Sequence, residues 1–359
     1  MNDVLFNKDN GPIKVLVVDD SPMMCKAIEK ILVQDDQIEV TAKALSGKEA
    51  LRALSTRQFD VCTLDVHMPG MNGLSVLKNI MVKYPIPTLM VSAFTGDGSK
   101  ITFEALRFGA VDFFKKPARN GDKEIQEQGQ SLIKSLKRAS RVQVQAARYL
   151  RVKPVSRNGR VGKEANNSPN DLKKICIIYG STGGYSSILA IVPFLMELPK
   201  GSVIVSLAVN KENLAAFVDY LQPYSLPSLS MVTDDTELRP GHVYFIPADH
   251  AAHFDKAGKG WEMSVKKRPI ESSKEGAIDL TLLSASESFG NGLLSIFVSG
   301  DGPFGITGAE EVVRNSGKLI VQRPAGCLAP YGPEMMVERF NADSAEPYEL
   351  SKLVNSWMK

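Results

Sequence analysis

The chain has 359 residues, of which 43% are hydrophobic and 23% are charged, and its formal net charge is +3. These fractions are typical of a soluble globular protein, and they exclude disordered, collagen-like and membrane-embedded classes. The length exceeds what one hydrophobic core commonly serves, so two domains are expected. No apolar run reaches the roughly 18–20 residues that span a bilayer, and the N-terminus lacks the apolar core of a signal peptide. We therefore expect a cytoplasmic protein without membrane insertion.

The net charge hides an uneven distribution along the chain. Residues 119–174 hold 14 Lys and Arg against 5 Asp and Glu, which leaves the rest of the chain acidic. Such a basic strip is suited to an acidic partner or to a nucleic acid. No nucleic-acid-binding motif accompanies the strip, which favours a solvated linker and argues against a nucleic acid as partner.

Residues 13–117 alternate short β-branched apolar runs with longer segments whose apolar residues follow the helical period. Five runs predict strands, namely "IKVLVVDD", "IEVTAKA", "FDVCTLDV", "PTLMVSA" and "AVDFFKKP". The segments between them, such as "SPMMCKAIEKILVQ" and "NGLSVLKNIMVKY", predict helices. This alternation predicts a parallel sheet with helices on both faces.

A second strand-helix series begins at Lys173 and predicts another α/β domain. Its expected strands are "KKICIIYG", "GSVIVSLAV", "GHVYFIPA", "LLSIFVSG" and "GKLIVQ". Helices are expected over residues 185–196 and over "NLAAFVDYLQ".

Two segments separate these series. Residues 120–150 predict a polar-rich helix with an apolar stripe, and residues 154–171, rich in Pro, Gly, Asn and Ser, predict a flexible connector. The expected organisation is a first domain at 13–118, a helical and flexible basic linker at 119–172, and a second domain at 173–359.

Polar side chains follow the strands of the first domain, at the edge where the carboxyl ends of parallel strands meet. Asp19 and Asp20 end the first strand, Asp65 the third and Ser92 the fourth, while Lys116 follows the fifth. Three carboxylates held together repel one another and require a cation, and hard oxygen ligands suit Mg²⁺. Asp65 is then placed to attack a phosphoryl group, whose oxygens Lys116 and Ser92 would contact. Helix caps and turn residues explain any one of these positions, but not five at matched strand ends.

The pieces "VLVVDDS", "LDVHMPGMNG", "VSA" and "FFKKP" resemble a response-regulator receiver domain over about residues 13–118. The resemblance implies a doubly wound, five-stranded parallel, flavodoxin-like fold in which a histidine kinase phosphorylates Asp65. The His67 side chain is expected at the surface. The resemblance further implies Mg²⁺ held by Asp19, Asp20, Asp65 and the backbone carbonyl of His67, with Ser92, Phe113 and Lys116 as switch residues.

The run "KICIIYGSTGG" places Ser181 in a glycine turn between a predicted strand and a predicted helix. Glycines permit a tight turn, and backbone N–H groups at a helix start are suited to holding an oxyanion, so Ser181 is a candidate nucleophile. A serine in such a turn is also often only the helix N-cap. Whether a base stands near Ser181 decides between these two roles.

The serine turn, "LRPGHVYFIPADH", "SGDGPFGITGA" and "GCLAPYGPEMMV" together resemble the catalytic domain of CheB, the family of chemotaxis protein-glutamate methylesterases. With the receiver, the resemblance covers nearly the whole chain. It implies hydrolysis of glutamyl methyl esters on chemoreceptors by serine, histidine and aspartate, under control of the receiver. The family serine falls on Ser181, but the histidine position holds Ala208 and the aspartate position holds Phe304. A serine hydroxyl needs a base within hydrogen-bond reach, so we expect hydrolysis to be lost and Ser181 to cap a helix.

Three functions stay open on the sequence. The first is a phosphorylated regulator whose degenerate output domain binds a chemoreceptor, a kinase or another signalling protein. The second is an active methylesterase with a relocated base, for which His250 or His253 in the loop "PADHAAHF" is the candidate. Asp301 stands three residues from the family aspartate position, and Asp279 is retained near the cleft. The third is a receiver that only draws phosphoryl groups from a shared kinase, which predicts unchanged signalling after deletion of residues 173–359.

Overall fold

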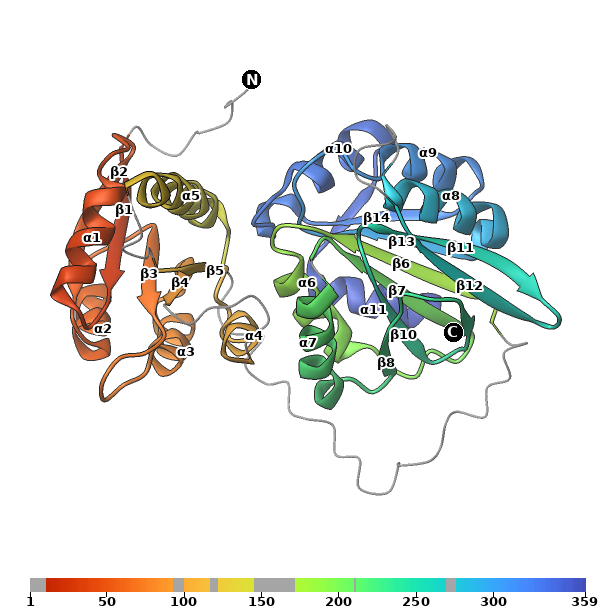
Figure 1. The fold of residues 1–359 in the computed structure, drawn as a ribbon, viewed down its shortest axis with the longest axis horizontal. Coiled ribbons are helices and arrows are strands. Elements are labelled where there is room, and N and C mark those ends of the chain that lie inside the picture. The colour runs from red at the N-terminus through yellow and green to blue at the C-terminus, as the bar shows by residue number, and fades with distance from the viewer. Residues whose placement is uncertain (1–10, 93–99, 117–121, 145–171, 210, 269–275) are drawn as a thin grey trace. The chain divides into compact units, whose positions relative to one another are not determined.

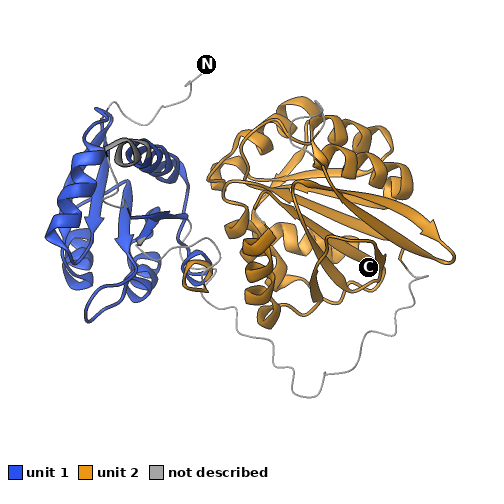
Figure 2. Cartoon of the chain, viewed as in Figure 1, with its two compact units in different colours: residues 1–96, 104–150 blue, residues 97–103, 151–359 orange. Residues whose placement is uncertain are grey.

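The computed structural model describes residues 11–92, 100–116, 122–144, 172–209, 211–268 and 276–359. The chain forms two compact units, one of residues 1–96 and 104–150 and the other of residues 97–103 and 151–359 (Figure 1, Figure 2). Both units have α/β structure, as the sequence predicts. Among the described residues, no helix combines the length and the apolar character that crossing a membrane requires.

The first ten elements alternate strand and helix, and their strands form one five-stranded sheet. The sheet has the order β2-β1-β3-β4-β5, and every neighbouring pair is parallel. All residues of β3 and nearly all of β1 are buried, which requires helices on both faces. The predicted doubly wound fold is therefore confirmed. The elements are β1 (Ile13–Val18), α1 (Pro22–Leu32), β2 (Ile38–Ala44), α2 (Gly47–Thr56), β3 (Val61–Asp65), α3 (Gly73–Lys83), β4 (Thr88–Ser92), α4 (Lys100–Arg107), β5 (Asp112–Lys115) and α5 (Asp122–Arg141).

Helix α5 belongs to the first compact unit, and it lies in the stretch where the sequence predicted a helix within a helical and flexible linker at 119–172. Leu132, Leu136 and Ala139 are fully buried along one face of α5, and the helix packs against α1 and the sheet. The buried part of the apolar stripe therefore packs against β3, β4 and β5. The expected connector at residues 154–171 lies outside the described residues.

The second unit is built on a seven-stranded sheet with the order β15-β14-β13-β6-β7-β10-β8, parallel throughout. A small antiparallel sheet, β11-β12-β9, accompanies it. The elements are β6 (Lys174–Gly180), α6 (Gly184–Ile191), β7 (Gly201–Leu207), α7 (Lys211–Leu221), β8 (Ser228–Met231), β9 (Thr236–Leu238), β10 (His242–Pro247), β11 (His250–Ala257), β12 (Gly260–Lys267), α8 (Ala277–Phe289), β13 (Leu293–Phe297), α9 (Ile306–Arg314), β14 (Lys318–Gln322), α10 (Tyr331–Phe340), β15 (Asp343–Ala345) and α11 (Pro347–Trp357).

Helix α6 is shorter than the sequence predicts. It ends at Ile191 and is followed by a 3-10 turn over Val192–Phe194, whereas the periodicity predicted a helix to residue 196. The reason is Pro193, which cannot donate the backbone hydrogen bond that a continuing helix needs and whose ring clashes with the preceding turn.

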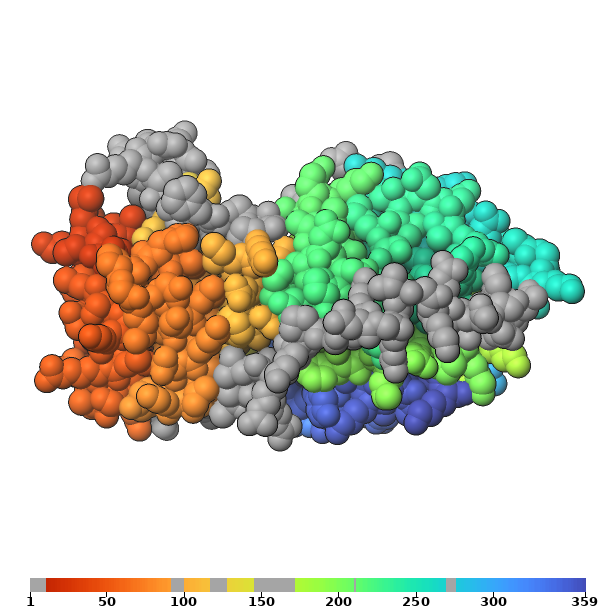
Figure 3. All heavy atoms as spheres, turned by 90° about the horizontal axis from the view of Figure 1, so that it is seen from below, coloured from red at the N-terminus to blue at the C-terminus, as the bar shows by residue number. Residues whose placement is uncertain are grey.

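The segment expected as the loop "PADHAAHF" is largely strand. Both His250 and His253 lie on β11, which forms a hairpin with β12 whose cyan tip projects from the second unit (Figure 3). Hydroxyl groups of α8 cover the outer edge of β11. Thr281 and Ser284 accept from the backbone N–H groups of Ala252 and Phe254, and the Ser288 hydroxyl donates to the Phe254 carbonyl. These bonds satisfy edge groups that would otherwise be open to another strand.

Candidate functional site

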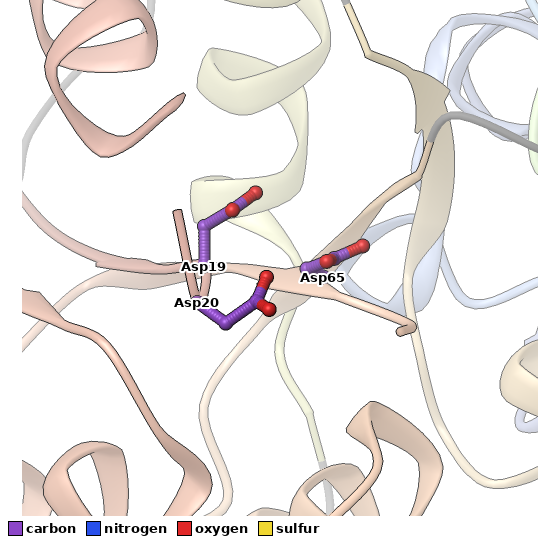
Figure 4. Close-up of side chains that lie close together, drawn as sticks. All are labelled: Asp19, Asp20 and Asp65. Atoms are coloured by element: carbon purple, nitrogen blue, oxygen red, sulfur yellow. The ribbon is translucent and has the colours of Figure 1, made fainter. Parts of the chain in front are cut away.

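The first site is a cluster of three carboxylates at the carboxyl ends of β1 and β3. Asp19 and Asp20 directly follow β1, and Asp65 is the last residue of β3, so the adjacency of these strands brings the three together. One carboxylate oxygen from each lies within 4.8 Å of the others (Figure 4). Asp19 and Asp65 are buried, whereas Asp20 is exposed. This is also where the strand order reverses, the usual place for a site in an open parallel sheet.

Lys116 supplies a cation to this cluster. Its Nζ lies 2.6 Å from Asp19 Oδ2 and 3.0 Å from Asp65 Oδ2. Burial alone would lower the pKa of Lys116, but its hydrogen bonds with the two carboxylates outweigh burial and hold the pKa above its usual value. Burial likewise raises the pKa of Asp65; Lys116 opposes the rise and the Asp19 charge adds to it. The lysine is therefore held fully charged against the carboxylate expected to react.

The donor set fits a divalent metal ion. Three carboxylates facing one ammonium leave two excess negative charges among these residues, and all the available ligand atoms are hard oxygens, which Mg²⁺ prefers. The exposed Asp20 leaves one side open to water, which Mg²⁺ commonly retains. Asp19, Asp20 and Asp65 are the residues that would hold it.

A glycine fixes the backbone beside the cluster. A Cβ atom at Gly73, the first residue of α3, would lie 2.0 Å from the carbonyl oxygen of Asp65. Only glycine therefore lets α3 begin against the end of β3. His67 is exposed, as expected, and its backbone N–H donates to the Asp65 carboxylate.

The remaining receiver residues lie on the next two strands. Ser92 is the last residue of β4 and Phe113 lies on β5, where it pairs with Met90. The Phe113 side chain is half-buried. The register places Ser92 opposite Lys115, next to Lys116, and Val91 opposite Asp65, while Phe113 lies two residues before Lys115 on β5.

The second site is the turn that holds Ser181, directly after β6. The Ser181 hydroxyl oxygen accepts a hydrogen bond of 2.9 Å from the backbone N–H of Asp301, and the Ser181 N–H donates to the Ser299 carbonyl. The Thr182 hydroxyl donates to the Asp301 carboxylate at 3.0 Å. A Cβ atom at Gly300 would stand 2.8 Å from the Ser181 hydroxyl oxygen, so the two turns interlock.

The expectation that Ser181 caps α6 is wrong. The N-cap is Gly183, whose φ of 82° lies in the left-handed region, and no side chain hydrogen-bonds to the start of the helix. The Ser181 side chain is turned instead toward the turn at residues 300–305.

In the described part of the chain, the Ser181 side chain is not hydrogen-bonded to a base. Among those residues, the hydrogen bonds of its side chain include no imidazole nitrogen and no carboxylate oxygen. Ala208 follows β7, and its N–H donates to the Gly180 carbonyl beside Ser181. Phe304 is 49% exposed at the end of the neighbouring turn.

The two candidate histidines have other partners. His250 Nδ1 lies 2.6 Å from Asp249 Oδ1, and His253 Nδ1 lies 2.8 Å from the Ser284 hydroxyl oxygen. Neither contact brings an imidazole to Ser181.

Asp279 has a structural role that the sequence did not reveal. Its Oδ2 accepts from the N–H groups of Gly276 and Gly305, each at 3.1 Å, and its Oδ1 accepts from Gly308 at 2.9 Å. One buried carboxylate thus caps α8 and ties it to the start of α9.

Burial, with a smaller contribution from the Asp279 charge, raises the pKa of Tyr179 to about 12.

Comparison with known proteins gives consistent matches to both units. Residues 15–127 match the response regulator receiver domain, and residues 176–354 match the CheB methylesterase domain. Similar proteins include the protein-glutamate methylesterase/protein-glutamine glutaminase of Pyrococcus abyssi, 30% identical over 94% of this chain and 91% of that protein. Those of Pyrococcus horikoshii and Thermotoga maritima are each 31% identical, over 94% and 93% of this chain and 91% and 95% of theirs.

Proposed function

Because the chain belongs to the CheB methylesterase family and carries a response-regulator receiver domain, we propose that it is a chemotaxis response regulator whose output domain binds a protein without hydrolysing it. The observation that carries this proposal is the contact of Ser181. Its oxygen accepts a backbone N–H from Asp301, and no base stands beside it among the described residues.

The absence of a base matters because a serine hydroxyl attacks an ester only when its proton is removed. Removing members of a serine triad leaves only the contribution of binding and of the oxyanion site, a loss of roughly 10⁴–10⁶ in rate. Neither Ala208 nor Phe304 carries a titratable atom. The Asp279 carboxylate already accepts hydrogen bonds from three backbone N–H groups. Turnover is therefore too slow to serve a signalling pathway.

The receiver supplies the regulation. Asp65 accepts a phosphoryl group from a histidine kinase, and the bond to the donor nitrogen breaks as the bond to the Asp65 oxygen forms. Lys116, already in contact with Asp65, neutralises charge on the phosphoryl oxygens. Asp19, Asp20 and Asp65 would hold Mg²⁺, which would add to this charge neutralisation when bound. Ser92 and Phe113 then report the phosphorylated state to the rest of the receiver.

The partner of the output domain is a chemoreceptor or another protein of the same pathway. The glycine turns and buried strands that shape the family's fold are intact, so the domain presents an ordered surface. A folded domain without a base is suited to binding a receptor tail without changing it.

Methanol release from a methylated chemoreceptor tests the proposal. The full chain is phosphorylated, with Asp65 occupancy measured on a phosphate-affinity gel, and compared with Ser181→Ala. We expect both proteins to stay at the background rate while the Thermotoga maritima relative releases methanol in the same assay. Release above background that disappears in Ser181→Ala would overturn the proposal.

A further inference from the structure

A groove lies between the β11–β12 hairpin and helix α8 in the second unit, and Ser181 is not among the residues that line it. We call it the hairpin groove, and its volume is about 370 Å³, within the range of ligand sites in proteins. One face of the hairpin forms one wall and α8 forms the other, where its hydroxyls bond the edge of β11. The lining residues are Ala251, Ala252, His253, Asp255, Ser264, Lys266, Arg268, Leu280, Leu283, Ser284 and Glu287.

Charges in the hairpin groove are separated by sign. Lys266 lies opposite Ala251 in the hairpin register, and Arg268 follows two residues later on the same face. Asp255 lies four residues further along β11 than Ala251, which is about 13 Å at the rise of a strand. On the other wall, Glu287 lies seven residues after Leu280, about 10 Å along the helix. The groove thus has a basic end and an acidic end.

Three of the four end charges are open to a ligand, and the fourth, Asp255, contacts His253. Among the described residues, Lys266, Arg268 and Glu287 form no ion pair. Leu280 and Leu283 are half-buried between the two ends and provide an apolar floor. Two neighbouring cations at one end and two carboxylates at the other favour a ligand that carries opposite charges at matching distance.

The centre of the groove is an ordered polar group. The Ser284 hydroxyl accepts from the Phe254 N–H and contacts His253 Nδ1 at 2.8 Å, and His253 Nε2 lies 3.4 Å from Asp255 Oδ2. The three side chains resemble a hydrolytic triad only in residue type. The side chains of His253 and Asp255 are 61% and 66% exposed, so water weakens their coupling, and the Ser284 oxygen already accepts a backbone N–H. The group is suited to binding polar atoms.

We infer that the hairpin groove binds an extended segment of a partner protein with an acidic side chain at Lys266 and Arg268 and a basic side chain at Asp255 and Glu287. Three to four extended residues span the roughly 10–13 Å between the two ends. The inference rests on the proposed function, because it names the surface through which a non-hydrolysing output domain would bind. Since the edge of β11 is already bonded to α8, the segment lies in the groove by its side chains rather than by adding a strand.

Binding of two capped peptides to the full chain tests the inference. The probes are acetyl-Glu-Ala-Leu-Lys-amide and acetyl-Lys-Leu-Ala-Glu-amide, which carry the charge pair in both directions. We expect one of them to shift the imidazole NMR signals of His253, assigned with His253→Gln. Replacing Lys266 and Arg268 together by Glu should weaken that binding about tenfold, and high salt should weaken it as well. The same double variant should bind acetyl-Lys-Ala-Leu-Lys-amide more tightly than the wild type does.

The matched control is replacement of Lys256 and Lys259 by Glu, which changes the charge of the same hairpin equally outside the groove lining. It should leave peptide binding unchanged. Equal weakening in the control, or no shift of His253 with either peptide, would overturn the inference. The methanol assay separates the two proposals. If neither peptide binds the hairpin groove, the inference fails, but the proposed loss of hydrolysis at Ser181 still stands or falls on methanol release alone.

Discussion

The backbone N–H of Asp301 points at the hydroxyl oxygen of Ser181 over 2.9 Å. In the proposed function, the Ser181 hydroxyl keeps its proton, because its one side-chain hydrogen bond in the described part of the chain is accepted from this N–H and involves no base. The turn around it stays closely fitted, since a Cβ atom at Gly183 would approach the Ser299 hydroxyl oxygen to 2.5 Å. On the proposed function, what is missing from the described part of this site is a base, while the close backbone fit of the turn is kept.

Restoring those groups should restore hydrolysis. We expect the double replacement Ala208→His and Phe304→Asp to raise methanol release from methylated receptor by about 10²–10⁴-fold, the usual contribution of a positioned base. Adding Ser181→Ala to the double variant should abolish the gain. If the double variant folds but its rate stays at the wild-type level, Ala208 and Phe304 are not the cause of the lost hydrolysis.

Lys116 should stabilise the receiver in the absence of Mg²⁺, because it offsets the repulsion between the carboxylates of the acidic cluster. Lys116→Met leaves Asp19 and Asp65 as a nearly buried pair of carboxylates without their cation, so we expect the free energy of unfolding to fall by about 2–4 kcal/mol without Mg²⁺. Millimolar Mg²⁺ should recover a large part of the loss, and urea unfolding of the receiver with and without the ion measures both. The control is Lys115→Met at the exposed neighbouring position, which should change little. A loss that Mg²⁺ does not reduce would contradict a metal site at these carboxylates.

The sequence predicted the first unit well because its signals are local. Buried apolar strands followed by aspartates define both the sheet and its site, and the structure brings Asp19, Asp20 and Asp65 together as expected. The sequence assigned the α5 stretch to the linker because residues 117–121 separate it from β5 and most of its residues are polar. Its membership depends on the burial of Leu132 and Leu136, a tertiary contact that periodicity alone does not assign.

The second unit was less predictable because its decisive contacts are distant in sequence. The partner of Ser181 is a backbone group 120 residues away, and the helix that Ser181 was expected to cap begins at Gly183 instead. Strand β11 was missed because Ala, His and Lys have weak strand preference; its pairing with β12 and its bonds to Thr281 and Ser284 make it a strand.

Tyr179 should make the second unit sensitive to alkaline pH. Its pKa is raised to about 12 by burial and by the Asp279 charge, against about 10 in the unfolded chain. Because the folded pKa is the higher one, the stabilisation is fully present below pH 10 and is lost as the pH rises through 12. We expect Tyr179→Phe to reduce the stability lost between pH 9 and pH 12 by roughly 1–3 kcal/mol, measured by urea unfolding. Tyr331→Phe, at an exposed tyrosine, should leave the pH dependence unchanged, and an equal effect of both variants would contradict the assignment.

Asp279 should matter to the fold rather than to chemistry. Asp279→Ala leaves the N–H groups of Gly276, Gly305 and Gly308 without their shared acceptor at the starts of α8 and α9. We expect the free energy of unfolding to fall by about 3–5 kcal/mol, since hydrogen bonds to a charged group contribute more than neutral ones. Asp279→Asn, which keeps one acceptor oxygen, should lose less, and Asp343→Ala at an exposed position should change stability by under about 0.5 kcal/mol. Circular dichroism during urea unfolding measures all three variants, and a loss for Asp279→Ala no larger than that for Asp343→Ala would show that the carboxylate does not hold the two helices together.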